Sequence, residues 1–311
     1  MINEFLSLKE LFKNHNLEKP EFISQAHQFH RRLYDYCEVL EECDIDQIRI
    51  TKSDVNFVVQ DMVFVCPRME TRAAPLEIMN FGAYEPKETE VLDRLVDGEN
   101  VLLDIGANIG WFAVRLKKKF PSLVVHAFEP MPQAYSYLQR NISSNLLGEG
   151  LYTYNYGLSE SAGIFDFFID VGNGTNASLL NVANSASASK VTCFTSTLDN
   201  WCLATGTTPD VIKCDVEGAE FLVYKGGFDS INEHKPKVFT ELLRKWAKPY
   251  GYHPNDVLDF FEEIGYLAYA VSESSVSRVT RINEQTTETN YVFLHREKHK
   301  LDIQRLNEMS V

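Results

Sequence analysis

The fold of this chain is decided by the stretch Val101-Leu-Leu-Asp-Ile-Gly-Ala-Asn-Ile-Gly-Trp-Phe-Ala-Val114. A short apolar run leads into a turn that holds Asp104, Gly106, Asn108 and Gly110, and a helical pattern follows at once. Glycine lets backbone approach a ligand where a Cβ atom would collide, and the first N–H groups of a helix can bind an anionic group. The stretch therefore predicts a strand, a tight turn and a helix that together bind a nucleotide-like molecule.

Strand and helix patterns alternate from this stretch onward. Two late strands, 266–271 and 291–295, have only a loop between them and predict an antiparallel addition. The whole order predicts an α/β fold, a Rossmann-like doubly wound sheet that is mostly parallel with an antiparallel C-terminal strand. The other expected strands are 101–104, 123–128, 152–156, 210–215 and 237–241, and the expected helices are 84–95, 109–120, 131–147, 218–224 and 256–264.

The N-terminal part carries a different pattern, which predicts a helical and β-hairpin extension. Apolar residues at helical spacing predict two helices, one around 5–12 and one around 22–40. Residues 55–59 and 62–66 flank a polar pair and predict a hairpin, and an irregular stretch follows between Pro67 and Pro75. We expect this region to cover a cleft or to form an oligomer contact. The expected domains are an accessory region 1–79, a core domain 80–296 and a C-terminal tail 297–311.

The composition is that of a soluble, acidic globular protein. The chain has 311 residues, 44% of them hydrophobic and 24% charged, and a formal net charge of -14. Because an acidic chain repels a phosphate backbone, we expect no nucleic-acid partner. We also expect no membrane span and no signal peptide, since no apolar run of roughly 18 residues and no basic start precede the core. Six cysteines without a C-x-x-C pair favour reduced thiols and a cytoplasmic location.

The glycine turn departs from the dinucleotide fingerprint G-x-G-x-x-G. Asn108 stands where the second glycine would let backbone touch a pyrophosphate, and Asp104 places a carboxylate ahead of the glycines. A carboxylate disfavours a pyrophosphate and favours an amino group, so the turn points away from NAD and toward the cationic cofactor S-adenosylmethionine. The second strand ends in Glu129, whose carboxylate can accept hydrogen bonds from both ribose hydroxyls.

Several motifs in this order resemble the FkbM family of S-adenosylmethionine-dependent methyltransferases. They are Asp104–Gly110, Phe128–Pro130, Gly157–Glu160 and Ile212–Glu220, with shorter matches at Ser178–Leu180 and Thr197–Asp199. The resemblance covers roughly residues 80 to 271, and its one departure is Gly157, where alanine is commoner. It implies that the methionine moiety lies at Asp104, Gly106, Asn108 and Gly110, the ribose at Glu129, and the adenine side at Leu158 and Ser159. Ala107, Pro130 and Asp215 complete the expected cofactor contacts.

The acceptor side of the site is expected at the ends of the fourth and fifth strands. Asp215 and Glu241 end these neighbouring strands at the edge where open α/β sheets bind ligands. Either carboxylate is a candidate base for a hydroxyl acceptor, or the two together hold a divalent metal that lowers the pKa of that hydroxyl. Lys213 alternates onto the side of Asp215, where we expect it to pair with a carboxylate, and Glu217 is a candidate substrate-binding residue.

The interval from about 160 to 200 breaks the alternation. It is interpreted as an extra strand, 163–169, followed by a mobile loop rich in Gly, Asn, Thr and Ser. Such a loop can fold over an acceptor and hydrogen-bond to a polyol. The candidate substrate-binding residues in it are Thr175, Asn176 and Ser178.

The leading interpretation is methyl transfer to a hydroxyl oxygen of a sugar, glycan or secondary metabolite, which is the acceptor class that the family resemblance implies. Alternatives that stay open are an N- or carboxyl-methyltransferase of the same fold, a nicotinamide-dependent dehydrogenase, and a non-catalytic cofactor-binding module. The expected partners are a small-molecule or glycan acceptor, with no nucleic acid and no membrane. A homo-oligomer also stays open.

Overall fold

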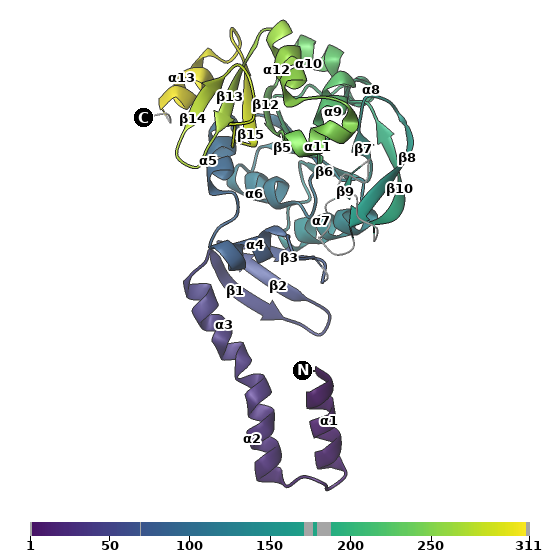
Figure 1. Cartoon of the computed structure of the whole chain (residues 1–311), viewed down its shortest axis with the longest axis vertical. Coiled ribbons are helices and arrows are strands. Elements are labelled where there is room, and N and C mark those ends of the chain that lie inside the picture. The colour runs from purple at the N-terminus through teal and green to yellow at the C-terminus, as the bar shows by residue number, and fades with distance from the viewer. Residues whose placement is uncertain (1, 69, 171–176, 179–187, 309–311) are drawn as a thin grey trace.

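A mixed eight-stranded sheet forms the centre of the computed structural model, which describes residues 2–68, 70–170, 177–178 and 188–308 (Figure 1). The first five strands in the order below run parallel, and the last three join antiparallel. The expected doubly wound α/β sheet with an antiparallel C-terminal strand is therefore confirmed. The order across the sheet is β6 (Leu151–Tyr154), β5 (Val124–Phe128), β4 (Val101–Ile105), β11 (Val211–Cys214), β12 (Lys237–Glu241), β15 (Asn290–His295), β13 (Tyr266–Val271) and β14 (Val276–Val279).

Helices cover both faces of this sheet because successive strand side chains point to opposite faces. Leu102 of β4 belongs to one apolar core, which also takes in α5 (Pro86–Leu95), α6 (Trp111–Lys119) and α7 (Pro132–Ser144). Leu103, the next residue, belongs to the other core. That core takes in α8 (Leu198–Thr205), α9 (Glu220–Lys225), α10 (Phe228–His234) and α12 (Pro254–Glu263).

The sequence patterns did not predict α8 or α10, and they also missed two helical elements closer to the C-terminus. A short helix, α11 (Arg244–Ala247), continues into the 3₁₀ turn η1 (Lys248–Tyr250) after β12. The segment expected as a C-terminal tail contains α13 (Lys300–Glu308), whose Leu306 is buried in the core that contains Leu102.

A smaller sheet follows β6 and has the order β7 (Gly157–Leu158), β10 (Ala188–Ser196), β8 (Gly163–Asp170) and β9 (Ala177–Ser178). The extra strand expected at 163–169 is confirmed as β8. Its partner β10 pairs with it antiparallel along its whole length, although the sequence pattern predicted only a loop there. Thr175 and Asn176 lie outside the described residues. The backbone of Ser178 pairs with Phe168 of β8.

The N-terminal region forms an arm and a third sheet. Three helices, α1 (Ile2–Lys13), α2 (Lys19–His30) and α3 (Arg32–Glu41), project from the rest of the molecule, where two helices were expected (Figure 1). The expected hairpin is present as β2 (Val55–Val59) and β3 (Met62–Val65), and β1 (Ile45–Ile50) adds an edge strand. The stretch after Pro67 is irregular only up to Ala73, because α4 (Ala74–Phe81) begins there with Pro75 in its first turn.

Two asparagines attach this third sheet to the core domain, Asn141 in α7 and Asn145 at the C-cap of that helix. The side chain of Asn141 accepts from the N–H of Val65 at 2.7 Å and donates to the carbonyls of Val65 at 3.1 Å and Ile109 at 2.8 Å. One turn later, Asn145 accepts from the N–H of Val63 at 2.9 Å and donates to its carbonyl at 2.7 Å. The edge of β3 is thus paired with side chains in place of a further strand.

Replacing Asn141 with alanine is expected to lower the free energy of unfolding by ~2–4 kcal/mol. The side chain is fully buried, so its loss leaves the N–H of Val65 without a partner. Urea denaturation measures the change. The matched control Gln139→Ala, at an exposed position of the same helix, should stay within ~0.5 kcal/mol of wild type. Equal stability of the two variants would contradict this account of the attachment.

Two further expectations concern the chain as a whole. All six cysteines are free thiols, and three of them, Cys193, Cys202 and Cys214, are buried. Within the described ranges, no helix is both long enough and apolar enough to cross a membrane.

Candidate active site

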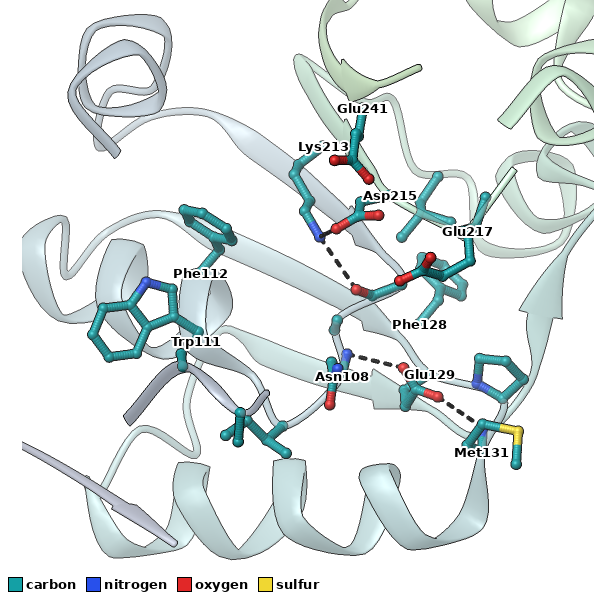
Figure 2. A pocket seen from close by; sticks show the side chains of 18 of the residues that line it. Asn108, Trp111, Phe112, Phe128, Glu129, Met131, Lys213, Asp215, Glu217 and Glu241 are labelled. Atoms are coloured by element: carbon teal, nitrogen blue, oxygen red, sulfur yellow. Dashed lines mark hydrogen bonds and ion pairs between the residues drawn. The ribbon is translucent and has the colours of Figure 1, made fainter. Parts of the chain in front are cut away.

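The carboxyl ends of four parallel strands, β4, β5, β11 and β12, surround a cavity of about 270 Å³ (Figure 2). Parallel α/β sheets bind ligands at this edge. The cavity brings together residues that are far apart in the sequence, from Arg72 to Glu241. The expected cofactor residues that line it are Gly106, Ala107, Asn108, Glu129, Pro130, Leu158 and Asp215.

The glycine turn after β4 fits between two other segments of backbone. Gly106 has φ 78°, and a Cβ atom there would lie 1.9 Å from the carbonyl oxygen of Asp215. The N–H groups of Gly106 and Ala107 both donate to the carbonyl of Phe128 at the end of β5. Gly110 also has positive φ, and its Cβ would lie 2.5 Å from Leu138 of α7. The glycines therefore let the turn sit tightly against the strand ends beside the cavity.

Replacing Gly106 with alanine is expected to lower the free energy of unfolding by ~2–4 kcal/mol, because the left-handed conformation and the clash with Asp215 both oppose it. Gly206 provides the matched control. It has φ 67°, but a Cβ atom there would meet no other described atom within 4 Å, so Gly206→Ala should cost only the ~1–2 kcal/mol of the conformation. Urea denaturation of both variants separates the steric clash from the backbone strain. Equal losses of unfolding free energy in the two variants would refute the tight fit of Gly106 against Asp215.

Glu129 is a buried carboxylate held at the cavity by backbone groups. Its side chain is 6% exposed and accepts from the N–H of Asn108 at 2.9 Å and of Met131 at 2.8 Å (Figure 2). Burial raises the pKa of Glu129 to about 7, and these two backbone N–H groups oppose the rise. A carboxylate has about four lone-pair positions, so two bonds leave capacity to accept from hydroxyl groups in the cavity.

Lys213 is a buried cation between two carboxylates. Its ammonium lies 3.4 Å from Asp104 and 3.7 Å from Asp215, and donates to the carbonyl of Gly106 at 3.2 Å. The expected pairing of Lys213 with a carboxylate is confirmed. Burial alone would lower the pKa of Lys213, but Asp104, Asp215 and Glu85 outweigh burial and raise it. Asp104 is 1% exposed and lies behind the turn rather than in the cavity lining.

Four carboxylates line one part of the cavity, on Glu85, Asp215, Glu217 and Glu241. Burial, and then the charge of Asp215, raises the pKa of Glu241 to about 9. The same two causes raise the pKa of Glu217 to about 8 and of Glu85 to about 7. Lys213 and Arg72 are the cations in the described lining and are outnumbered by these four carboxylates, so the cluster carries excess negative charge that binds protons or another cation.

The side chain of Glu220 holds the backbone of the loop that carries Asp215 and Glu217. This side chain is 1% exposed and accepts from the N–H groups of Val216 and Gly218, both at 3.0 Å. The hydroxyl of Tyr252 donates to Glu220 at 3.2 Å. The lock supports Glu217 at φ 54°, a left-handed conformation that a non-glycine residue adopts only when its surroundings enforce it.

Two further expected cofactor residues, Gly110 and Ser159, are not among the residues that line the cavity. Gly110 packs against Leu138, and Ser159 is buried with its N–H bonded to the carbonyl of Ser196. Among the described residues, no group of three or more His, Cys, Asp or Glu side chains is arranged to hold a metal ion. The metal site expected from Asp215 and Glu241 stays a prediction, and the chemistry proposed for the cavity does not use a metal.

Sequence reasoning missed part of the lining. The N-terminal segment contributes Arg72, Glu77, Tyr84 and Glu85, so this region does border the cavity. Glu85 has φ 43° and stands directly before Pro86, the first residue of α5. Its position before a proline that begins a helix can be recognised in the sequence. The neighbouring residues do not show that its side chain lies near Asp215. Trp111, Phe112, Met131 and Phe167 supply apolar lining.

The fold and the site together define a class of protein. The strand order, the glycine turn after β4 and the acidic residue that ends β5 are those of the Rossmann-like fold of S-adenosylmethionine-dependent methyltransferases. Residues 104–268 match the methyltransferase FkbM domain, and the chain belongs to this family. Membership of this family rules out the alternative of a nicotinamide-dependent dehydrogenase.

Two characterised relatives are similar over parts of their length. Methyltransferase sdnD of Sordaria araneosa is 44% identical over 62 residues, which cover 20% of this chain and 24% of that protein. The 2-O-methyltransferase NoeI of Sinorhizobium fredii is 27% identical over 166 residues, 49% of this chain and 67% of that protein. The crystal structure of methyltransferase FkbM from Methylobacillus flagellatus has 18% identity and a TM-score of 0.42, over 64% of this chain and 44% of that one.

Proposed function

We propose that this chain transfers a methyl group from S-adenosylmethionine to a hydroxyl oxygen of a sugar, glycan or secondary metabolite. The observation that carries the proposal is the buried Glu129, which backbone N–H groups hold at the cavity next to the glycine turn. The name of the relative NoeI, a 2-O-methyltransferase, supports an oxygen acceptor.

The residues of the cavity fit the cofactor. When bound, S-adenosylmethionine supplies an activated methyl group on a positively charged sulfur. Glu129 would accept the ribose hydroxyls, and Leu158 would lie on the adenine side. The backbone from Gly106 to Asn108 would hold the methionine end beside Asp215. The excess of carboxylates over Lys213 favours a cationic ligand at this end.

Glu241 is the proposed base. Asp215 lies 3.7 Å from the ammonium of Lys213 and forms an ion pair with it. Glu241 is mostly buried and has a raised pKa, so it takes a proton more strongly. The carboxylate of Glu241 would take the hydroxyl proton of the acceptor whose oxygen receives the methyl group.

The charge of the cavity separates the other acceptor classes. A carboxylate acceptor would meet the side chains of Glu85, Glu217 and Glu241, so carboxyl methylation is disfavoured. An amine acceptor would meet no such repulsion, and N-methylation is the second candidate. Turnover with a panel of methyl glycosides and of primary amines, followed by NMR location of the new methyl group, distinguishes the two. Methyl on nitrogen, or no release of S-adenosylhomocysteine with either panel, would overturn the oxygen assignment.

Exhaustive chelation is expected to leave the rate of methyl transfer unchanged, because the proposed base, Glu241, takes the hydroxyl proton without the help of a metal. The measurement is the rate with EDTA and after dialysis against it. A loss of rate that added Mg²⁺ restores in wild type, but not in Asp215→Asn, would assign Asp215 to a metal after all.

A further inference from the structure

The carboxylates of the cavity suit one part of the proposed cofactor and repel another. The methionine end of S-adenosylmethionine carries an ammonium group, which the cluster around Asp215 attracts, and a carboxylate, which the same cluster repels. Tight binding of this end therefore calls for a cation as well. The described lining contains two cationic side chains, those of Lys213 and Arg72.

Lys213 is engaged by oxygens of the chain itself. It stands directly opposite Asp104 in the pairing of β11 with β4, so the two side chains share one face of the sheet. Its ammonium lies between the carboxylates of Asp104 and Asp215 and donates to the carbonyl of Gly106. These three partners match the three donors of an ammonium group, so Lys213 holds the turn and Asp215 in place.

Arg72 is held less closely than Lys213. Its guanidinium lies 3.8 Å from the carboxylate of Glu77, farther than a hydrogen bond reaches, and its side chain is 62% exposed. A guanidinium presents N–H groups in a planar fork that binds a carboxylate through two parallel hydrogen bonds. The side chain of Arg72 can therefore bind an anionic group of a ligand in the cavity that it lines.

The backbone at Arg72 is fixed by a buried side chain. Glu70 is 5% exposed, and one of its carboxylate oxygens accepts from the N–H of Thr71 at 2.9 Å and from the N–H of Arg72 at 2.8 Å. Helix α4 begins two residues farther on, at Ala74. The N-terminal segment thus presents Arg72 at a defined place on the wall of the cavity.

Arg72 lies near the loop that borders the glycine turn. Burial, and then the charge of Asp215, raises the pKa of Glu217, and the charges of Arg72 and Lys213 oppose that rise. The loop that carries Asp215 and Glu217 in turn meets the glycine turn, since a Cβ atom on Gly106 would collide with the carbonyl oxygen of Asp215. Arg72 is therefore on the side of the cavity that is proposed for the methionine end.

We infer that Arg72 binds the carboxylate of the methionine end of S-adenosylmethionine, an assignment that rests on the proposed function. The ammonium group at the same end then faces Asp215, so that each charge of the cofactor meets its opposite. The N-terminal segment, which lies outside the central sheet, completes the cofactor site in this way.

The test compares two ligands by calorimetric titration of the full chain. Decarboxylated S-adenosylmethionine keeps the ammonium and sulfonium groups and lacks only the carboxylate. Arg72→Met is expected to weaken binding of S-adenosylmethionine roughly tenfold, and to leave binding of the decarboxylated ligand as tight as in wild type or tighter. Arg72→Lys keeps the charge but loses the planar fork, so its affinity for S-adenosylmethionine should lie between those of wild type and Arg72→Met. Arg68→Met is the matched control, because Arg68 is exposed in the same stretch and is not among the lining residues, and it should bind both ligands as wild type does.

Equal effects of Arg72→Met on the two ligands, or no effect on either, would overturn the inference, while binding of S-adenosylmethionine by wild type would still support the proposed cofactor. Wild-type affinity in Arg72→Lys would show that the charge acts without the paired hydrogen bonds, and would overturn the contact. An Arg72→Met variant in which only the KM of the acceptor rises would assign Arg72 to the acceptor instead. A folded wild-type chain that binds neither ligand would overturn the proposed function itself, and this inference with it.

Discussion

Replacing Glu241 with glutamine is expected to lower kcat by ~10²–10⁴-fold, the contribution of a positioned general base. The amide keeps the size of the side chain but cannot accept the hydroxyl proton. Affinity for S-adenosylmethionine should change little, because Glu129 and the glycine turn are untouched. Steady-state release of S-adenosylhomocysteine and a calorimetric titration measure the two quantities. The comparison variant Asp215→Asn should lose less turnover than Glu241→Gln.

The pH dependence of kcat/KM is a second test of Glu241 as the base. A base must be deprotonated to act, and burial with the charge of Asp215 raises the pKa of Glu241 to about 9. The kcat/KM of wild type should therefore rise between pH 7 and about 9, and that rise should vanish in Glu241→Gln. A variant that keeps both the wild-type rate and its rise with pH would remove Glu241 from the chemistry.

The stability of the cofactor-free protein should depend on pH in the opposite direction. The pKa of Glu241 is higher in the folded state than the ordinary value of 4.5, so the folded state holds this proton more tightly than the unfolded state. The stabilisation is complete below pH 4.5 and is lost as pH rises through about 9. Glu241→Gln carries no titrating group at this position, so its unfolding free energy should fall less over that range.

Replacing Glu129 with alanine is expected to weaken S-adenosylmethionine binding by ~1–3 kcal/mol, a factor of roughly 5 to 150 in Kd. The affinity falls because the ribose hydroxyl groups of the cofactor would lose the charged acceptor of their hydrogen bonds. Turnover at saturating cofactor should stay near that of wild type, because Glu129 does not touch the acceptor. Calorimetric titration and a cofactor-dependent rate curve measure the two effects.

Because the N–H groups of Asn108 and Met131 also lose their acceptor in this variant, a second substitution separates binding from folding. Glu129→Gln keeps an acceptor oxygen for the backbone but not the charge, and should show an intermediate Kd. Glu263→Ala, at an exposed position at the end of α12, is the control and should bind as wild type does. Wild-type affinity in both Glu129 variants would refute the ribose assignment.

The parts of the fold that were predictable are those with strong local patterns. The run from Val101 to Val114 combines a buried strand, glycines with positive φ and an apolar helix face, and the structure forms all three. Strand β1 was missed because its side chains are mostly exposed on both faces of the sheet, as Asp46, Gln47 and Arg49 show. It therefore lacks the alternation of apolar and polar residues that marks a half-buried strand. Strand β10 was missed for a similar reason, since its Ser and Thr residues are typical of loops.

The residues of the candidate site were likewise predictable only where a local sequence pattern places them. Glu129 and Asp215 end buried strands, and the topology of a parallel sheet brings such ends together. Glu85 was not predictable, because it reaches the cavity from a segment before β4, the first strand of the central sheet along the chain, and its position depends on tertiary packing. Glu220 ends the motif Ile212–Glu220 in the sequence, and only the structure shows that its side chain faces the loop backbone rather than the cavity.

The central claim is that this cavity binds S-adenosylmethionine through Glu129. Calorimetric titration of the wild-type chain with S-adenosylmethionine, and separately with NAD, tests it most directly. The account predicts one cofactor per chain, binding that weakens by ~1–3 kcal/mol in Glu129→Ala, and no heat of binding with NAD. Binding of NAD, or no binding of S-adenosylmethionine by a folded chain, would contradict it.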